Sequence, residues 1–379
     1  MLCTAYTDLV PATAASRGPL TVDAACGVGA PAMQPLITRL SSALQMSVVN
    51  GVGEGELNAG CGAEFVQKGR LAPRSLDTPP TPEGGGSAEV PAKRACSLDG
   101  DADRIVFHYW RAPSPAVGDK RAADGAEWRL VDGDKIAALF ASFVCAELST
   151  LALETPLSLA CVQTAYANGA AGAYIRSLGV QTRIAKTGVK YVHHVAVQYD
   201  VAVYFEANGH GTLLFSDVAV AALKAAKTKA EAASDAAKAA AASRLLAARQ
   251  LVNQAIGDAL SDMLLAEAIL TLRGWTIEDW DALYDDLPSR QTKLAVADRT
   301  AVTVTADETR TIEPAALQPE LDALAAAYPN GRCFVRPSGT EDVVRVYAEA
   351  DTQGHADELA SKVAQVTYRI AGGVGEMPS

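Results

Sequence analysis

A chain of 379 residues is long enough to form two or three domains with their own hydrophobic cores. The formal charge of −11, from 33 Lys and Arg against 44 Asp and Glu, argues against nucleic acid or an anionic membrane as a partner. The seven cysteines lack C-x-x-C pairs, which fits reduced thiols. The pattern predicts neither a secretory signal nor a membrane span, so we expect a cytoplasmic protein.

The first third of the chain predicts mixed helix and strand. Short strands and a helix near residues 33–44 are expected within 19–70. Residues 71–93 are rich in Pro, Gly and Ser and predict a flexible surface insertion. A linker is expected over 113–130. A helix should then run to residue 145, with Asp132 and Asp134 capping its start rather than binding metal.

The rest of the chain alternates strands with helices and ends in a compact segment. Strands near 159–162 and 181–184 flank a helix at 169–178, which is typical of a βαβ unit. The Ala-rich residues 219–250 predict helices without a chemical role. Strands at 300–305, 333–335 and 343–349, followed by a helix at 356–370, predict a small α+β domain.

Residues 97–107 carry the strongest chemical signal. Asp99, Asp101 and Asp103 alternate, so their carboxylates can converge on one divalent cation of the kind that prefers oxygen ligands. Arg104 follows directly and can hold a phosphate oxygen beside that metal. An apolar strand begins at Ile105. A metal next to a guanidinium is an arrangement suited to phosphoryl chemistry.

Three other interpretations compete for this loop. An EF-hand requires Gly at its sixth position and Glu at its twelfth, where this chain has Arg104 and Trp110. An aspartyl-phosphate hydrolase would use one Asp, such as Asp99, as its nucleophile. A solvated acidic turn would need no ligand. The loop by itself excludes only the EF-hand.

Two later loops favour the phosphoryl interpretation. Residues 205–212 read Phe-Glu-Ala-Asn-Gly-His-Gly-Thr after an apolar strand, so Glu206 and Asn208 can face one side and bind hydroxyls. His210 can carry a proton near neutral pH, although a polar turn with a structural His explains the same residues. Residues 336–342 read Arg-Pro-Ser-Gly-Thr-Glu-Asp, which combines a guanidinium, two hydroxyls and turn amides into a possible anion site. A tight surface turn is the alternative for this loop.

The three loops, in this order, resemble the α-D-phosphohexomutase superfamily. Matching segments also lie at 22–30, 57–63, 163–170 and 187–190, so the resemblance covers nearly the whole chain. The segment FEANGHGT, which contains Asn208, resembles the corresponding segment of the phosphoacetylglucosamine mutase family rather than that of phosphoglucomutases. The resemblance implies an α/β fold with two consecutive mixed α/β domains and a smaller α+β C-terminal domain. Their expected ranges are 19–112, 131–292 and 293–379, after a remnant or linker at 1–18.

The resemblance also implies roles for individual residues. Members interconvert N-acetylglucosamine 6-phosphate and 1-phosphate through a 1,6-bisphosphate, on the route to UDP-N-acetylglucosamine, with Mg²⁺ as cofactor. The three aspartates would hold Mg²⁺, and Arg104 would neutralise the transferring group. Lys190 and His210 would move protons or stabilise charge, and Glu206, Asn208 and Gly209 would bind the sugar. The other phosphate would be bound by residues near the C-terminus, namely Arg336, Ser338, Gly339, Thr340 and Arg345.

One family element has no counterpart here. The family carries a phosphorylated serine in a T-A-S-H-N-P-type loop upstream of the metal loop, and these 379 residues contain no such segment. Ser16 lacks the His-Asn-Pro continuation and is interpreted as a linker serine. The chain is therefore expected to be inactive alone, with an N-terminal domain of the same gene product as a possible missing partner. The alternative is a non-catalytic, Mg²⁺-dependent protein that binds a phosphorylated N-acetylhexosamine.

Overall fold

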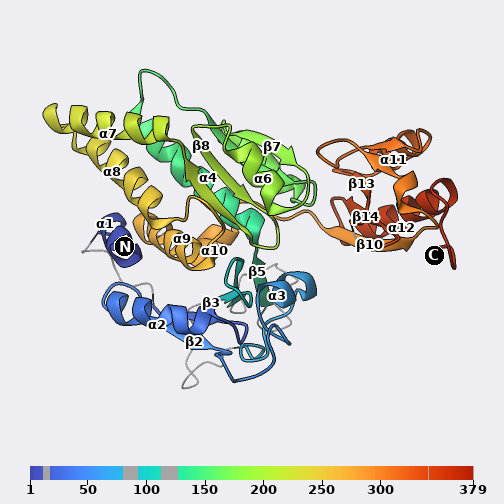
Figure 1. Cartoon of the computed structure of the whole chain (residues 1–379), viewed down its shortest axis with the longest axis horizontal. Coiled ribbons are helices and arrows are strands. Elements are labelled where there is room, and N and C mark those ends of the chain that lie inside the picture. The colour runs from blue at the N-terminus through green and yellow to red at the C-terminus, as the bar shows by residue number, and fades with distance from the viewer. Residues whose placement is uncertain (12–17, 80–92, 112–126, 340, 379) are drawn as a thin grey trace, which may run out of the picture. The chain divides into compact units, whose positions relative to one another are not determined.

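The computed structural model describes residues 1–11, 18–79, 93–111, 127–339 and 341–378 (Figure 1). It divides into two compact units, where the sequence predicted three domains. Unit 1 consists of Met1–Cys161, Tyr174–Gln181 and Ala196–Leu283. Unit 2 consists of Val162–Ala173, Thr182–Val195 and Tyr284–Ser379.

A five-stranded sheet in unit 1 carries the predicted metal loop between its third and fourth strands. The strand order is β2-β1-β3-β4-β5. β1 pairs in parallel with β2 and β3, whereas β3–β4 and β4–β5 are antiparallel. The strands are β1 (Leu20–Asp23), β2 (Met46–Val49), β3 (Lys93–Leu98), β4 (Ile105–Arg111) and β5 (Glu127–Val131).

Strand β5 corrects the predicted linker over 113–130. Residues 127–130 belong to the sheet, because Trp128 and Leu130 lie two residues apart, face the same side and pack with Phe65, Val66 and Val106. Residues 113–126 of that linker and residues 80–92 of the predicted insertion lie outside the described residues.

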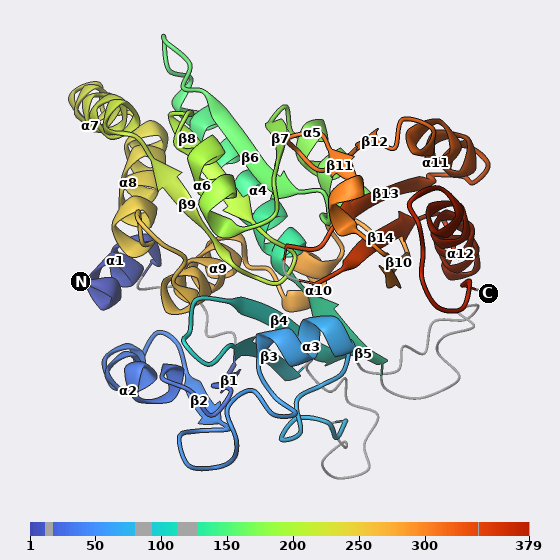
Figure 2. The same cartoon turned by 45° about the vertical axis from the view of Figure 1, so that its right-hand side comes forward.

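Three helices accompany this sheet. α2 (Gly29–Leu40) packs on β2, and α3 (Ala63–Gly69) packs on β3 and β4. The helix predicted at 33–44 thus begins earlier, because Pro31 is tolerated in a first turn, and ends at Leu40. α1 (Leu2–Leu9) lies in the segment predicted as a remnant or linker. It buries Ala5, Tyr6 and Leu9 and packs against α8 (Ala236–Leu251) and α9 (Ala259–Arg273) (Figure 2).

A layer of helices also belongs to unit 1. It contains α4 (Gly133–Leu151), α7 (Asp217–Ala232), α8 (Ala236–Leu251), α9 (Ala259–Arg273) and α10 (Ile277–Asp281). α4 begins as the sequence predicted, because the Asp132 carboxylate accepts a hydrogen bond from the amide of Asp134 at 3.0 Å. The Ala-rich segment forms α7 and α8, capped by Ser216 and Asp235. α4 also packs on β8 (Val201–Phe205), the strand that leads into the predicted sugar loop.

A second sheet has four strands in the order β7-β6-β8-β9. These are β6 (Leu159–Thr164), β7 (Gln181–Ala185), β8 (Val201–Phe205) and β9 (Gly211–Phe215). α5 (Gly169–Ser177) connects β6 to β7, which confirms the predicted βαβ alternation. α6 (Val189–Ala196) follows β7. β8 and β9 form an antiparallel hairpin whose turn contains residues 206–210.

The C-terminal part of unit 2 is an antiparallel sheet of order β10-β14-β13. It is built from β10 (Ser289–Ala295), β13 (Arg332–Pro337) and β14 (Val343–Glu349), with α11 (Leu317–Ala326) and α12 (Gln353–Ile370). Val335, Val344, Val346 and Leu359 are in its core. β10 starts four residues before the predicted boundary at 293, because it pairs with β14 along its whole length.

The strand predicted at 300–305 is largely wrong. The Asp298 side chain accepts from the amide of Thr300 at 2.8 Å and caps a 3₁₀ helix, η1 (Arg299–Ala301). The strand in this range is β11 (Thr303–Val304), and it pairs with β12 (Thr311–Glu313). The turn between β11 and β12 contains Glu308, which contacts residues of the candidate site.

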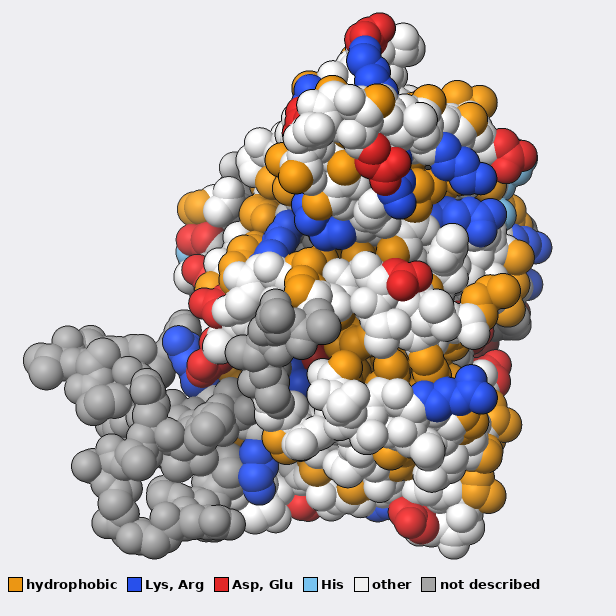
Figure 3. All heavy atoms as spheres, turned by 90° about the vertical axis from the view of Figure 1, so that its left-hand side faces the viewer, with side chains coloured by type: hydrophobic (Ala, Val, Ile, Leu, Met, Phe, Trp, Pro, Cys, Tyr) orange, Lys and Arg blue, Asp and Glu red, His pale blue; other side chains and the backbone are white. Residues whose placement is uncertain are grey.

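Among the described residues, every helix is too short or too polar to cross a bilayer. The face drawn in Figure 3 mixes acidic, basic and hydrophobic side chains without a broad field of one sign. This face therefore offers no support for a nucleic-acid partner.

Candidate functional site

The three aspartates of the loop between β3 and β4 lie together. Oxygen atoms of Asp99, Asp101 and Asp103 are all within 4.8 Å of one another. Asp99 is buried, Asp101 is exposed and Asp103 is intermediate. Asp103 Oδ1 is buried and has no hydrogen-bond donor in the described part of the chain. Three converging carboxylates with an unsatisfied buried oxygen fit a hard divalent cation such as Mg²⁺.

The loop wraps around Asp99. Asp99 Oδ1 accepts hydrogen bonds from the amides of Asp103 and Arg104, each at 3.1 Å. Ala102 adopts a left-handed φ of 60° to complete the turn. Burial, together with the charges of Asp103 and Asp101, raises the pKa of Asp99 to about 7, although the Arg104 amide lowers it. A bound cation would oppose this repulsion.

Arg104 lies beside the aspartates as the sequence predicted. Its Nε is 3.5 Å from Asp99 Oδ2 and 3.7 Å from Asp103 Oδ1. Its Nη1 is 3.6 Å from Glu64 Oε2 of α3, a contact that the sequence did not predict. The Arg104 side chain is one-third exposed. It can therefore approach an anion while the acidic groups hold it in place.

Glycines allow the metal loop to pack against the loop that precedes α2. A Cβ on Gly27 would lie 2.2 Å from the carbonyl oxygen of Gly100, so this position excludes any side chain. The amide of Val28 donates to the same oxygen at 3.0 Å. Residues 22–30, identified from the sequence only as a family-like segment, thus pack directly against the metal loop.

The predicted sugar loop lies against the metal loop within unit 1. The amide of Ile105 donates to the carbonyl of Gly209 at 3.1 Å. Gly209 has φ 89°, and a Cβ there would be 1.9 Å from the carbonyl oxygen of Ile105. Gly209 is therefore required for close backbone approach. Asn208 Oδ1 accepts from the amide of His210 at 3.0 Å, which leaves its amide nitrogen for a ligand. Glu206 and Asn208 are both half-buried.

His210 faces the metal ligands. Its Nδ1 lies 3.2 Å from Asp103 Oδ2, and its side chain is about one-tenth exposed. A Cβ on Gly257 would lie 2.7 Å from His210 Nε2, so the loop before α9 confines the ring. The sequence predicted a proton-transfer or charge-stabilising role for His210. The geometry favours orientation of Asp103 as an additional role.

The predicted phosphate residues lie in unit 2, at the end of β13. Arg336 Nε donates to the hydroxyl of Tyr166 at 3.0 Å, and Nη1 lies 3.4 Å from Glu308 Oε1. Ser338 is buried, and its amide donates to the carbonyl of Val343 at 2.9 Å. That amide is therefore not available to an anion. Gly339 is exposed, and Thr340 lies outside the described residues.

Cations line up across this sheet. Arg336 is directly opposite Arg345, and Arg345 is directly opposite Lys293. Directly opposite residues of an antiparallel pair point to the same face, and like charges placed in this way are destabilising. An anion bound between Arg336 and Arg345 would offset that repulsion. Glu341 Oε2 lies 3.5 Å from Lys293 Nζ, and Glu308 Oε1 lies 3.4 Å from Arg336 Nη1. Within the described part of the chain, Arg345 is therefore the member of this row without an acidic partner.

Lys190 also lies in unit 2, at the start of α6. It is exposed, and its Nζ lies 4.9 Å from the centre of the Tyr191 ring, with Lys186 Nζ at 5.2 Å. The turn before it is held by Glu308, whose Oε2 accepts from the amide and hydroxyl of Thr187 at 3.0 and 2.6 Å. Sequence reasoning missed Glu308 and Tyr166, because nothing local marks either as a partner of Arg336.

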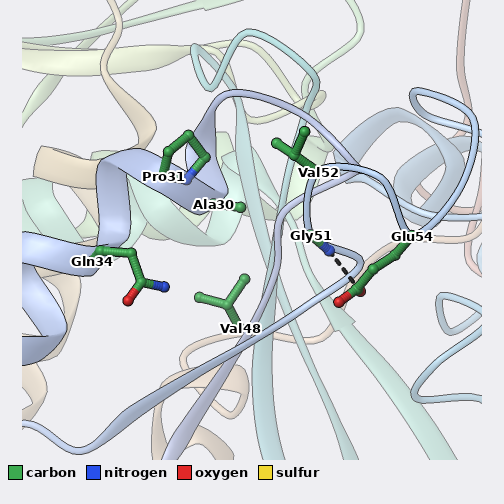
Figure 4. A pocket seen from close by; sticks show the side chains of 7 residues that line it. All are labelled: Ala30, Pro31, Gln34, Val48, Gly51, Val52 and Glu54. Carbon is green, nitrogen blue, oxygen red and sulfur yellow. Dashed lines mark hydrogen bonds between the residues drawn. The ribbon is translucent and has the colours of Figure 1, made fainter.

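The pocket in Figure 4 lies in unit 1 but contains none of the predicted site residues. It is lined by the start of α2, the end of β2 and the following loop, namely Ala30, Pro31, Gln34, Val48, Gly51, Val52 and Glu54. Glu54 Oε2 accepts from the amide of Gly51 at 2.7 Å and stabilises that loop. The described lining of the pocket is mostly apolar and contains no Lys or Arg that could bind a phosphate.

Two family models match the chain. "Phosphoacetylglucosamine mutase AMG1, domain III" matches residues 132–275. "Phosphoglucomutase/phosphomannomutase, C-terminal domain" matches residues 288–366. Together they cover most of the chain that follows the metal loop.

Curated and solved relatives extend the match to the N-terminal part. The chain is 44% identical over 374 residues to phosphoacetylglucosamine mutase of Arabidopsis thaliana, covering 96% of the chain and 64% of that protein. It is 44% identical over 362 residues to the Homo sapiens protein of that name, covering 95% and 61%. It thus spans less than two thirds of these relatives.

A solved structure gives the same result. Aspergillus fumigatus N-acetylphosphoglucosamine mutase, in complex with GlcNAc-6P and magnesium, is 39% identical and superposes with a TM-score of 0.82, covering 97% of this chain and 68% of that one. With 39% identity over two thirds of a solved member, the chain belongs to the phosphoacetylglucosamine mutase family of the α-D-phosphohexomutase superfamily.

Proposed function

We propose that this chain supplies the metal, sugar and phosphate sites for interconversion of N-acetylglucosamine 6-phosphate and 1-phosphate. The observation that carries the proposal is the cluster of Asp99, Asp101 and Asp103 beside Arg104. A solvated acidic turn would not explain why Asp103 Oδ1 is buried without a donor.

Each site has a defined task in this proposal. The three aspartates would hold Mg²⁺, which supplies Lewis-acid stabilisation of charge on a phosphoryl oxygen. Arg104 neutralises developing charge from the other side of the same loop. Glu206 and the amide nitrogen of Asn208 bind sugar hydroxyls, while the Asn208 carbonyl stays on the turn.

The second phosphate would be bound in unit 2. Arg336 and Arg345, opposite each other on β13 and β14, provide the positive charge, with Ser338, Gly339 and Thr340 completing the loop. Lys190 and His210 remain candidates for proton transfer or charge stabilisation. A sugar 1,6-bisphosphate would be the intermediate. The comparison structure from Aspergillus fumigatus supports the choice of ligand, since it holds GlcNAc-6P and magnesium.

Phosphoryl transfer also needs a group that accepts and returns the phosphate. These 379 residues contain no T-A-S-H-N-P-type loop, and Ser16 lies outside the described residues. We therefore expect binding but no turnover from this chain by itself. A non-catalytic sugar-phosphate-binding protein is the second candidate, favoured by the same absence of a phosphoserine loop from the sequence.

Isothermal calorimetry tests the metal site. Mg²⁺ should bind the chain, and Asp101→Asn should weaken that binding by roughly tenfold, because the site loses one charged ligand. Asp285→Asn, an exposed acid in unit 2, is the matched control and should leave binding unchanged. Identical Mg²⁺ affinity for wild type and Asp101→Asn would overturn the assignment.

A further inference from the structure

Glu308 is a buried acid next to the predicted phosphate arginine. It lies in the turn between β11 and β12, has a left-handed φ of 59° and is 4% exposed. Its amide donates to the carbonyl of Thr305 at 2.9 Å, and the amide of Thr305 donates to the carbonyl of Arg310 at 2.8 Å. The backbone on both sides of Glu308 is therefore fixed, and its side chain enters the interior of unit 2.

The Glu308 carboxylate has a different partner on each oxygen. Oε2 accepts from the amide of Thr187 at 3.0 Å and from its hydroxyl at 2.6 Å. Oε1 lies 3.4 Å from Arg336 Nη1. One carboxylate thus connects the turn that precedes Lys190 to the arginine at the end of β13. A buried carboxylate is tolerated only where such partners replace water.

Arg336 is held from a second side. Its Nε donates to the hydroxyl of Tyr166 at 3.0 Å, and its guanidinium carbon lies 5.3 Å from the centre of that ring. In the part of the chain that the structure describes, Nη2 makes no hydrogen bond. Two nitrogens are therefore occupied by the protein, and the third is left for a ligand.

We propose that Glu308 is a positioning residue that fixes Arg336, together with the Thr187 turn, for a sugar phosphate. The proposal rests on the proposed function and deepens it. The two hydrogen bonds from Thr187 to Oε2 hold the carboxylate in place, so that Oε1 faces Arg336 Nη1 while Nη2 is left for the ligand. Preorganisation of the guanidinium reduces the entropy lost on binding.

Calorimetry with N-acetylglucosamine 6-phosphate and with unphosphorylated N-acetylglucosamine tests this role. Glu308→Gln should weaken binding of the phosphorylated sugar by roughly five- to tenfold and leave the unphosphorylated sugar unchanged. Arg336→Ala should weaken binding of the phosphorylated sugar by roughly 10–100-fold. The loss expected for Glu308→Gln is smaller because Arg336 itself still contacts the ligand. Glu320→Gln, an exposed position in α11, is the matched control.

A double variant separates positioning from a general loss of structure. If Glu308 acts through Arg336, adding Glu308→Gln to Arg336→Ala should weaken binding no further. Additive losses, or equal losses for both sugars, would overturn the proposal. Tighter binding by Glu308→Gln would also overturn it, since Glu308 would then be a competitor. If Arg336→Ala leaves phosphate binding unchanged, the phosphate site itself fails, which is a distinct result.

Discussion

His210 Nδ1 lies 3.2 Å from Asp103 Oδ2, so the loop after β8 contacts a predicted metal ligand directly. The two loops are about 100 residues apart in sequence, and they are also joined by the hydrogen bond from Ile105 to Gly209. The loop proposed to bind the metal and the loop proposed to bind the sugar therefore support each other within unit 1. This arrangement leads to the first two predictions.

His210→Ala should weaken Mg²⁺ binding by roughly tenfold, because groups that orient a metal ligand contribute about 10–100-fold to affinity. His210→Asn should restore most of it, since the Asn amide nitrogen can replace Nδ1. His355→Ala is the control. His355, in α12, also contacts an aspartate, since its Nδ1 lies 2.6 Å from Asp351 Oδ1. Calorimetry with Mg²⁺ provides the measurement. Unchanged affinity in His210→Ala would show that the imidazole does not orient Asp103.

Gly209→Ala should destabilise unit 1 and weaken Mg²⁺ binding, because the new Cβ would meet the carbonyl of Ile105. Gly179→Ala is a matched control, with φ 80° and no atom within 4 Å of the new Cβ. The control should lose only about 1–2 kcal/mol, the strain of a left-handed conformation. Thermal unfolding and calorimetry should show the larger loss, and the loss of Mg²⁺ binding, in Gly209→Ala alone. Equal behaviour of the two variants would contradict the close approach.

Asp262→Asn should stabilise the protein at neutral pH. Asp262 in α9 is 1% exposed, and both its oxygens lack donors among the described residues, since the nearby Thr212 hydroxyl donates to the carbonyl of Asn253. Burial, and next the charge of Asp258, raises the pKa of the Asp262 carboxyl well above its usual value. The folded state therefore becomes less stable as pH rises above the unfolded pKa of about 3.9.

The expected gain for Asp262→Asn at pH 8 is about 1–3 kcal/mol, from removing an unsatisfied buried charge. It should shrink as pH falls toward 4 and vanish below it, because the unfolded carboxyl then becomes protonated, as the folded carboxyl already is. Thermal unfolding at several pH values measures this, with Asp285→Asn as the exposed control. A gain that is independent of pH would show that the charge of Asp262 is not the cause.

The sequence predicted those features that depend on local patterns. Residues 343–349 form β14 over the range expected, because alternating apolar residues face one core. The three aspartates converge because alternation on a short loop suffices to bring them together. The contact of Glu308 with Arg336 and Thr187 could not be predicted from a local pattern. Thr187 is 121 residues away from Glu308, and only the fold brings the two together.

The most direct test of the account is an assay of this 379-residue chain alone. N-acetylglucosamine 6-phosphate, Mg²⁺ and a sugar 1,6-bisphosphate would be supplied, and formation of the 1-phosphate would be followed by phosphorus NMR. The Aspergillus fumigatus relative serves as the positive control. We predict that the chain binds the phosphorylated sugar without turning it over. Robust turnover by the lone chain, abolished by Ser16→Ala, would contradict it.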